Sequence, residues 1–384
     1  MTDWLVIYEK PQSMSSDNWH KPAMSTPTPD SLPLLLSGVS AMALLKGVSR
    51  SFYLSIRVLP SALRAPIAVA YLLARATDTL ADTPTLPVAE RAEMLDTLAE
   101  AIQKGPDAGI DKESGDWRAI SARFAALDHD PAEQALLNAL PHCMATLRSM
   151  YTADQQDIRR VLHHITQGQA QDLARFAGTG VVRALANAQE VDAYTYSVAG
   201  CVGEFWTTLC FRHVPDFAQL PLAQMTALGR RFGMGLQRLN IIRDLQADLA
   251  AGRCYLPKDA LAACGLAPQE LSAPPPSFAP FYQAWLDETQ ALLNDGMTYA
   301  MAIQSRRTRA ASALPALVGT RTLALLRAAG PVAQMPPVKM ARAEMRALLL
   351  RLACTLAGRR ALERHYRQLS AFTYPSAAMG QSPQ

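Results

Sequence analysis

The chain has 384 residues, of which 49% are hydrophobic and 18% charged, and this composition is too apolar for a disordered protein. The net charge of +4, from 37 basic and 33 acidic residues, lacks the basic excess typical of nucleic-acid-binding proteins, so we expect no nucleic-acid partner. A mean hydropathy of +0.01 is high for a cytosolic enzyme and indicates an apolar interior cavity, a surface that touches a membrane, or both.

The cysteines and the apolar segments indicate the cellular compartment in which the protein is expected. The six cysteines form no CxxC pair and stand on apolar stretches, which predicts reduced, buried thiols and no zinc or haem site. The first residues lack a basic segment followed by an apolar run, so no signal peptide is predicted. The apolar stretch 343–358 is broken by Arg346 and Arg351 before it reaches the roughly 18–20 residues of a membrane span. We expect a cytoplasmic protein; peripheral contact with the inner membrane and the oligomeric state stay open.

The predicted elements are helices from one end of the chain to the other. The first residues are rich in Pro, Ser and Thr, which predicts a disordered leader. Apolar residues then recur at helical spacing, interrupted by a polar loop at 104–116, a proline-rich loop at 267–280 and a break near residue 330. Alternating strand patterns bounded by hairpin turns are missing. The sequence therefore predicts an all-α fold with a leader over 1–35, a single domain over 36–372 and a disordered tail over 373–384.

The segment 61–82 is apolar nearly all round but carries one polar strip. At about 100° per residue, its polar residues fall within a wedge of about 60°. A helix this apolar is expected to be buried, so the strip must look into a cavity or onto a partner group. Its two acids stand at i,i+4, where like charges repel, so they need a cation. The members of this first strip are Tyr71, Arg75, Asp78 and Asp82.

The segment 230–257 carries a second strip, formed by Gln237, Asn240, Asp244 and Asp248 and spread over about 80°. Oxygen ligands from Asp and Asn suit a hard cation, and Mg²⁺ binds few protein oxygens while it keeps waters and substrate phosphates. One Asp-x-x-x-Asp motif alone is commonly a surface pair. Two of them, each extended by polar residues on an apolar helix, favour two facing helices that hold several Mg²⁺ ions around a diphosphate.

Single residues outside the strips fit the same cavity, each with an alternative. Arg50 lies ahead of the first strip, where it would pair with phosphate oxygens or lie on the surface. Arg243 would also pair with phosphate, or with an acid of another helix, because its side chain is rotated about 100° from that of Asp244. Asp172 stands within a mainly apolar helix, and Tyr299 on a late helix is either a cavity wall or a core residue.

An apolar stripe lies between the two strips in the chain. Tyr194, Val198 and Val202 follow one another at a spacing of four residues, beside Gly200 and Gly203. The two glycines would let a neighbour or a ligand approach the backbone closely. The stripe is therefore either a cavity wall or ordinary core packing.

Four stretches resemble the squalene/phytoene synthase family, in that family's order and at similar separations. They are SRSF at 49–52, YLLARATDTLAD at 71–82, YTYSVAGCVG at 194–203 and QRLNIIRDLQADLAAGRCYLP at 237–257. The likeness covers about residues 38–372, and the second acidic motif is highly specific. It implies an isoprenoid-synthase helical bundle around a central hydrophobic cavity, in which two Asp-rich motifs face each other and bind Mg²⁺ and prenyl diphosphate substrates.

Within the family, the first two stretches resemble squalene synthases more than phytoene synthases. So does PPVKMARAE at 336–344, in which Lys339 and Arg342 match a segment that contacts the NADPH phosphate in squalene synthases; a basic helix start on the surface is the alternative. Two features depart from the pattern. The membrane anchor of eukaryotic squalene synthases is missing, and Ala247 replaces an acid common before the last Asp of the second motif, which weakens any statement on the number of metal ions.

The resemblance implies the head-to-head condensation of two farnesyl diphosphates to presqualene diphosphate and its reduction by NADPH to squalene. Mg²⁺ and arginines would stabilise the leaving diphosphate, and Tyr194 is the candidate for the proton transfer that closes the cyclopropane. Apolar walls would keep water from the cations. The residues so implied are Asp78, Asp82, Asn240, Asp244 and Asp248 for Mg²⁺; Arg50, Tyr71, Arg75, Gln237, Asn240 and Arg243 for the diphosphate; Phe52, Val198, Val202 and Tyr299 for the cavity; and Lys339 and Arg342 for NADPH.

Other functions fit the same residues. A phytoene or dehydrosqualene synthase would make a conjugated triene without NADPH, and in a hydroxysqualene-forming synthase water would trap the cation. A class I terpene cyclase would need one diphosphate substrate and no basic cofactor segment. A non-catalytic helical assembly or membrane-adaptor protein is expected to have lost the acids, and all four are present.

Overall fold

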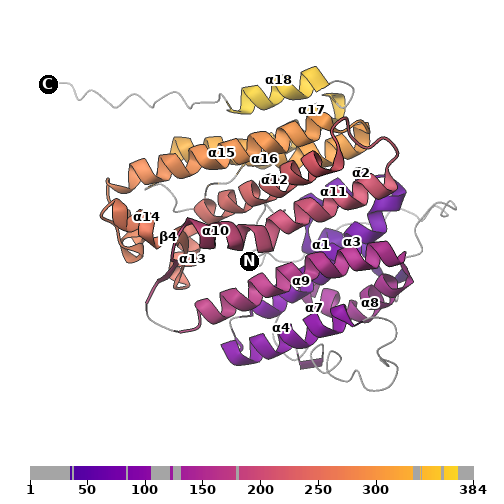
Figure 1. Ribbon diagram of the computed structural model, residues 1–384, viewed down its shortest axis with the longest axis horizontal. Helices are drawn as coiled ribbons and strands as arrows, with labels where there is room; N and C mark the ends of the chain where they lie inside the picture. The colour runs from indigo at the N-terminus through magenta and orange to yellow at the C-terminus, as the bar shows by residue number, and fades with distance from the viewer. Residues whose placement is uncertain are drawn as a thin grey trace, which may run out of the picture. The chain divides into compact units, whose positions relative to one another are not determined.

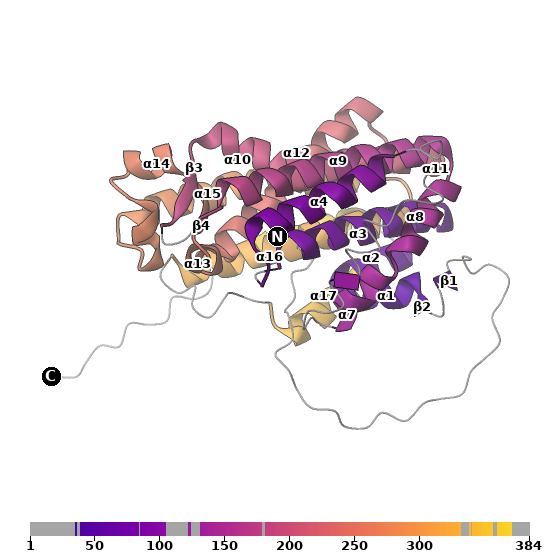
Figure 2. The same ribbon diagram turned by 90° about the horizontal axis from the view of Figure 1, so that it is seen from below.

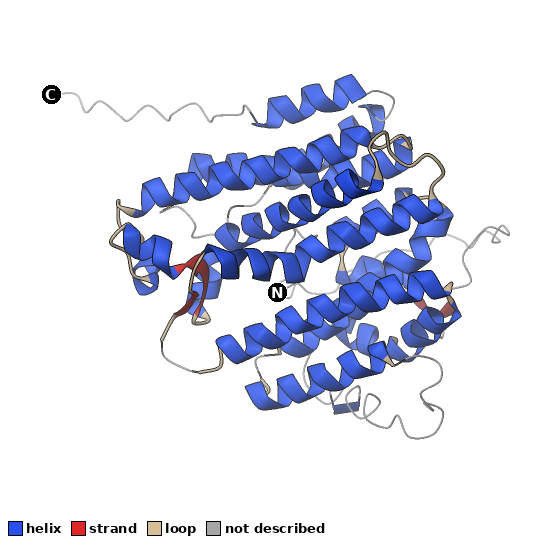
Figure 3. Ribbon diagram, viewed as in Figure 1, coloured by secondary structure: helices blue, strands red, loops and turns tan. Residues whose placement is uncertain are grey.

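We describe a computed structural model of the chain, which is helical almost throughout the residues that it describes (Figure 1, Figure 3). The all-α prediction is confirmed. The predicted leader except Leu35, the predicted tail, and nearly all of the predicted polar loop lie outside the described residues. Those residues are 35–36, 39–83, 85–104, 122–123, 131–178, 181–331, 338, 340–355 and 359–370.

The chain divides into two compact units. The first unit comprises residues 1–177 and 196–230, and the second comprises residues 178–195 and 231–384. The long helix α12 (Leu222–Arg243) contributes to both. The single domain that the sequence predicts stays a prediction, and the two units are described one after the other.

The first unit is built around α3, which lies against α4, α8, α9 and α11 (Figure 2). The short strands β1 and β2 pair antiparallel at its start. In chain order its described elements are β1 (Leu35–Leu36), β2 (Val39–Ser40), α1 (Ala41–Val48), α2 (Arg50–Val58), α3 (Ser61–Ala81), α4 (Val88–Gln103), α7 (Pro131–Asn138), α8 (Leu140–Ser149), α9 (Thr152–Arg175), the π-helical turn η1 (Tyr196–Gly200), α11 (Cys201–His213) and the first part of α12.

Helix α3 is buried on all sides, as its sequence predicts. Every residue from Pro66 to Ala81 is buried except Arg75. Pro60 fixes the entry to the helix, and the ring of Pro66 sits in its second turn, where the helix continues although one N–H is missing. Packing on all sides therefore fixes the position of the helix that carries the first polar strip.

A buried ion cluster joins the first turns of α9 to the end of α11. Arg212 donates from Nη1 to Asp154 Oδ1 at 2.6 Å and from Nη2 to Asp157 Oδ2 at 2.5 Å. His213 Nε2 lies 2.9 Å from Asp154 Oδ1. Asp154 and Asp157 are only 3% and 7% exposed, so the arginine supplies a charge that both acids need in order to remain buried.

Helices α11 and α12 approach each other at a pair of glycines. A Cβ atom placed on Gly203 would lie 1.9 Å from the carbonyl oxygen of Gly229, so no side chain fits there. Thr207 Oγ1 donates to the Gly203 carbonyl oxygen at 2.7 Å, which satisfies that oxygen beside the contact. The close backbone approach expected at Gly203 is confirmed, and the neighbour is another backbone of the same unit.

In the second unit, the long helices α15 and α16 lie side by side (Figure 1). Helices α17 and α18 pack against this pair. None of the helices that the structure describes, in either unit, combines the length and apolar character needed to cross a membrane. The described elements are β3 (Arg183–Leu185), α10 (Ala188–Thr195), the second part of α12, α13 (Leu245–Ala250), β4 (Arg253–Pro257), α14 (Lys258–Ala263), the 3₁₀ turn η2 (Pro268–Ser272), α15 (Phe278–Ala302), α16 (Arg306–Ala329), α17 (Arg342–Thr355) and α18 (Arg359–Ser370).

The short strands are a feature that the sequence did not predict. Strands β3 and β4 pair in parallel, with Arg183 opposite Arg253 and Ala184 opposite Cys254. The segment 253–257 was expected to continue a helix. Strands of three and five residues are too short to show an alternating pattern, so periodicity does not reveal them.

Arg238 links α12 to α15 within the second unit. Its guanidinium carbon lies 4.0 Å from the centre of the Trp285 ring, and Trp285 Nε1 donates to the Arg238 carbonyl oxygen at 3.1 Å. Glu288, one turn further along α15, forms an ion pair with the same guanidinium. These contacts fix the face of α12 that packs on α15 and leave its other faces for the second polar strip.

The cysteines differ from one another in exposure. Four are buried, and burial raises the pKa of the Cys143 thiol to about 12 and that of Cys254 to about 11. Cys264 and Cys354 are exposed, so the prediction that all six thiols are buried is wrong for these two. Cys264 directly follows the short helix α14. Cys354 lies in the last turn of α17, where residues of an apolar stretch of sequence are exposed to solvent.

Candidate functional site

Arg75 and Asp78 of the first strip form a buried ion pair on α3. Arg75 Nη1 donates to Asp78 Oδ2 at 2.8 Å, and Asp78 is 1% exposed. A carboxylate at this depth is costly without a positive partner. The cation that the strip requires is thus supplied, for Asp78, by a residue of the strip itself.

The other end of the guanidinium contacts an acid that sequence reasoning missed. Arg75 Nη2 donates to Glu133 Oε1 at 3.1 Å, and the two side chains are 16% and 17% exposed. Glu133 belongs to α7, which packs on α3. Because 58 residues separate the two partners, no local spacing could have indicated the contact.

Tyr71 and Asp82, the ends of the first strip, differ in their surroundings. Tyr71 is buried, and its hydroxyl donates to the carbonyl oxygen of Val48 at 3.4 Å. Asp82 follows the last helical residue, and its N–H donates to the Asp78 carbonyl oxygen at 2.9 Å. It is half-buried, so the strip is deeply buried as far as Asp78 and opens toward solvent at Asp82.

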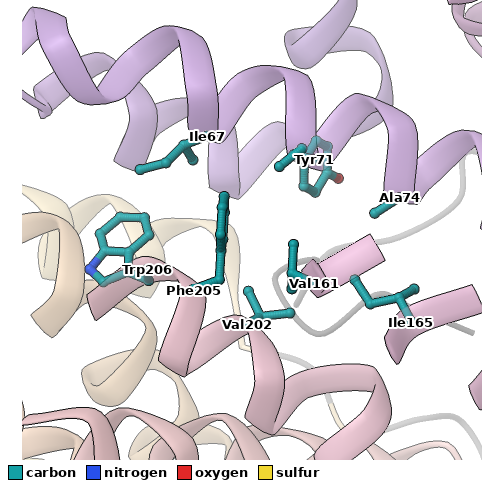
Figure 4. A pocket seen from close by; sticks show the side chains of 9 residues that line it. Ile67, Tyr71, Ala74, Val161, Ile165, Val202, Phe205 and Trp206 are labelled. Carbon is teal, nitrogen blue, oxygen red and sulfur yellow. The ribbon is translucent and has the colours of Figure 1, made fainter. Parts of the chain in front are cut away.

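An apolar cavity of about 30 Å³ lies beside the first strip, between α3, α9 and α11 (Figure 4). Tyr71 and Val202, two residues of the sequence prediction, are among its lining. A space of this size holds about one water molecule, so a prenyl chain would need the surrounding side chains to move apart. The lining residues are Ile67, Ala70, Tyr71, Ala74, Val161, Ile165, Val202, Phe205 and Trp206.

The second strip spans a break between α12 and α13. Asp244 has φ and ψ of −100° and 7°, outside the helical range. Its N–H still donates to the Asn240 carbonyl oxygen at 2.9 Å, and its own carbonyl oxygen accepts from the Asp248 N–H at 3.0 Å. Hydrogen bonds of helical type therefore run through the break, and the polar residues keep their spacing of one turn.

Both acids of the second strip lie against an arginine. Arg243 donates from Nε to Asp244 Oδ1 at 2.8 Å and from Nη2 to Asp244 Oδ2 at 2.5 Å. The sequence predicted that a rotation of about 100° turns Arg243 away from Asp244, but the two side chains form an ion pair at the residue where the backbone leaves the helical conformation. Asp248 Oδ1 lies 3.3 Å from Arg253 Nη2. Asp244 is the more open acid, with 41% of its side chain exposed against 15% for Asp248.

A chain of polar side chains leads from Tyr194 to the second strip. Gln237 Nε2 donates to the Tyr194 hydroxyl at 3.2 Å, and Asn240 Nδ2 donates to Gln237 Oε1 at 3.3 Å. Tyr194 stacks on Tyr255, with ring centres 4.6 Å apart, and all four residues are buried. The structure thus brings Tyr194, Gln237 and Asn240 together within the second unit. Tyr255 was missed, although it stands in the YLP end of the second acidic stretch.

The remaining predicted residues lie in several environments. Val198 is 1% exposed in η1 and Tyr299 is 2% exposed on α15, as core residues are. Arg342 begins α17 and is exposed. The side chains of Arg50 and Phe52, on α2, and the whole of Lys339 lie outside the described residues, so their predicted roles stay predictions.

The acids of the two strips are the candidate ligands for a metal ion. In the part of the chain that the structure describes, three or more His, Cys, Asp or Glu side chains nowhere gather into a preformed metal site. Each unit instead presents a pair of carboxylates one turn apart. Mg²⁺ is commonly bound by one or two carboxylates plus substrate phosphates, so such pairs fit it.

The family profile described as squalene/phytoene synthase matches residues 45–344. The chain belongs to the squalene/phytoene synthase family. The match includes both acidic strips and the stripe at Tyr194 between them, so the buried Arg–Asp pair on α3 and the polar chain beside Asp244 both lie within the family's domain.

Relatives within the family differ in the reaction that their names state. The chain is 28% identical over 243 residues to a bifunctional lycopene cyclase/phytoene synthase of Colletotrichum graminicola, which covers 62% of this chain and 37% of that protein. It is 28% identical over 290 residues to the squalene synthase of Saccharomyces cerevisiae, covering 74% of this chain and 60% of that protein. The solved structure of TcSQS with a ligand shares the fold, with a TM-score of 0.66, 20% identity, and coverage of 86% and 89% of the two chains.

The chain therefore spans about two fifths of the first relative's length and three fifths of the yeast protein's length. These comparisons give the family and the helical fold.

Proposed function

We propose that the chain condenses two molecules of farnesyl diphosphate head to head to presqualene diphosphate and reduces this product with NADPH to squalene. The observation that carries the proposal is the pairing of three motif acids with arginines: Asp78 with Arg75, Asp244 with Arg243 and Asp248 with Arg253. A surface that binds both Mg²⁺ and diphosphate needs negative groups for the cation and positive groups for the anion. We further propose that each strip contributes side chains that bind Mg²⁺ and diphosphate.

The pairing supports an exchange of partners when the substrate binds. The diphosphate oxygens take the guanidinium groups of Arg75 and Arg243, whose planar donors match phosphate oxygens. Asp78 and Asp244 would then be available to hold Mg²⁺. Bound Mg²⁺ supplies the positive charge that stabilises the departing diphosphate. Glu133 keeps its contact to Arg75, so the guanidinium stays in position during the exchange.

Tyr194 is proposed for the proton transfer that accompanies cyclopropane closure. One C–C bond forms between the first allylic cation and the 2,3 double bond of the second substrate, and closure of the ring releases one proton. Gln237 donates to the Tyr194 hydroxyl oxygen and so fixes its orientation. A free phenol has a pKa of about 10, so the Tyr194 hydroxyl does not keep an extra proton. Tyr194 passes the proton on, and the released diphosphate is the final base.

Product analysis tests the function. Purified protein with farnesyl diphosphate, Mg²⁺ and NADPH is expected to yield squalene, and presqualene diphosphate or related alcohols without NADPH. Asp78→Ala and Asp244→Ala should each abolish the product, whereas Asp287→Ala, which removes an exposed acid of α15, should not. Squalene formation that survives Asp78→Ala or Asp244→Ala would remove these acids from the site.

The phytoene synthase relatives make a second reaction the main rival. A phytoene- or dehydrosqualene-type enzyme would give a conjugated triene whose ultraviolet spectrum is distinctive, with or without NADPH. A hydroxylated C30 alcohol would indicate that water ends the reaction instead of hydride. The mass and spectrum of the product, with and without NADPH, separate these reactions.

A further inference from the structure

Gln169 is a buried amide whose polar atoms have no partner among the described residues. The residue lies on α9 and is 1% exposed, yet neither Nε2 nor Oε1 has a hydrogen bond. Burial of an amide without hydrogen bonds is unfavourable, and such groups are rare in folded proteins. The side chain therefore calls for a partner beyond the described residues.

A second glutamine on the same helix shows the usual arrangement. Gln155, also buried, donates from Nε2 to the carbonyl oxygen of Arg148 at 3.0 Å and to that of Met150 at 2.8 Å. It belongs to the first turn of α9 and ties that turn to the end of α8. Gln169 makes no such tie to another described residue.

The position of Gln169 continues the lining of the apolar cavity. Val161 and Ile165 line the cavity from α9 (Figure 4), and Gln169 follows Ile165 by one turn. At about 100° per residue, these three residues and Asp172 fall within a wedge of about 80° on α9. Asp172 is 4% exposed, so the face changes from apolar to polar while it remains buried.

Helix α3 changes from apolar to polar in the same direction. Figure 4 shows Tyr71 of α3 opposite Val161 of α9, and Ala74 opposite Ile165, so the two helices run the same way along the cavity. The next turn of α3 after Ala74 carries Asp78. The next turn of α9 after Ile165 carries Gln169. Both helices thus place polar side chains at the same end of an apolar space.

The turn η1 covers α9 beside this position. A Cβ atom on Gly168 would lie 3.0 Å from the Ser197 Cβ and 3.1 Å from the Val198 Cγ1, so the backbone of α9 and η1 are in close contact here. A π-helical turn inside a helix is uncommon and is frequently found at a functional site. The buried amide therefore follows directly the residue of α9 that contacts the distorted helix, and it lies at the end of the cavity toward which α3 carries Asp78, all within the first unit.

We infer that the Gln169 amide binds the diphosphate end of the prenyl diphosphate substrate, a step that rests on the function proposed above. An amide offers a donor and an acceptor without a net charge. Its N–H groups suit diphosphate oxygens, and its oxygen suits the waters that Mg²⁺ keeps. Gln169 thereby marks the place where the apolar chain of the substrate ends and its charged group begins.

A pair of matched variants tests this role. Gln169→Met and Gln155→Met each replace an amide with an unbranched apolar side chain of similar length on the same helix. The thermal unfolding midpoint is measured without ligand, and the binding of inorganic pyrophosphate in the presence of Mg²⁺ is measured by calorimetry. Gln169→Met should unfold at the same temperature as the parent protein or higher, because an unpartnered buried amide is lost. It should weaken pyrophosphate binding by about tenfold or more, the size expected for hydrogen bonds to a charged group.

Gln155→Met should show the opposite pattern, a lower unfolding temperature with unchanged pyrophosphate binding. A Gln169→Met protein that unfolds as early as Gln155→Met would overturn the inference, because the amide would then have a partner within the chain. Unchanged pyrophosphate binding by Gln169→Met would overturn it as well. If the parent protein itself bound no pyrophosphate with Mg²⁺, the proposed function would have failed, and not the assignment of Gln169 alone.

Discussion

Arginine contacts distinguish the motif acids from ordinary surface acids. Asp78 is nearly inaccessible to solvent and is held by Arg75, which a second acid, Glu133, holds from α7. The sequence predicted Arg75 and Asp78 on one face because both belong to one helix, where spacing fixes direction. It could not predict Glu133 or Tyr255, because contacts between distant segments depend on how the helices pack.

Glycine at position 203 is expected to be indispensable for packing. Gly203→Ala would place a Cβ 1.9 Å from a backbone oxygen of α12, so the helices must move apart. We expect a loss of stability of about 3 kcal/mol or more, at the upper end for overpacking, measured by urea unfolding. Gly47→Ala is the control, because among the described residues its Cβ would meet only Ala132 Cβ at 3.4 Å, and alanine favours a helix. Equal midpoints for both variants would refute the steric argument.

Helices with a strong apolar pattern are the elements that the sequence predicts well. α3 was expected from apolar spacing and is buried as predicted, since a helix without a solvated face has to be enclosed. The break at Asp244 and the strand β4 were not predicted, because hydrogen bonds of helical type run through the break and a strand of five residues shows no period. The paired geometry of Arg243 and Asp244 follows from that break.

The ion cluster between α9 and α11 should contribute much more stability than a surface pair. Arg212→Ala removes the guanidinium that Asp154 and Asp157 share, and leaves Asp154 with His213 and Asp157 with the exposed Arg160. Removing one partner of a buried pair costs about 3–5 kcal/mol. Arg367→Ala, which breaks an exposed pair with Glu363 on α18, should cost less than about 1 kcal/mol. The measurement is the urea midpoint at unchanged slope. If the two variants unfold at the same urea concentration, the cluster carries no special share of the stability.

At the scale of the whole molecule, the described part of the chain is helical almost throughout, around a large apolar core. Composition predicted the apolar interior, and the family resemblance, now supported by a match over residues 45–344, predicted the helical fold. The division into two units was not foreseen, because it depends on which helices contact each other and not on the pattern of any one of them. The exposure of the individual cysteine thiols was not foreseen either, because it also depends on which helices contact each other.

Thiol reactivity should follow exposure. In the folded protein, Cys264 and Cys354 are expected to react first with a thiol reagent at pH 8, while the other four react only after unfolding. The thiolate is the reactive form, and burial raises the pKa of Cys143 to about 12, so this thiol stays protonated far above neutral pH. Labelling followed by mass spectrometry of peptides would identify the modified residues. Rapid labelling of Cys143 or Cys210 would contradict the packing described.

Each acidic strip is proposed to hold magnesium-bound diphosphate. Calorimetric binding of pyrophosphate with Mg²⁺ to the parent protein, Asp78→Asn and Asp244→Asn tests this proposal most directly. We predict that each of the two changes weakens pyrophosphate binding by about tenfold or more, the size expected when a contact to a charged ligand is lost. Unaltered binding in either variant would contradict the proposed role of its strip.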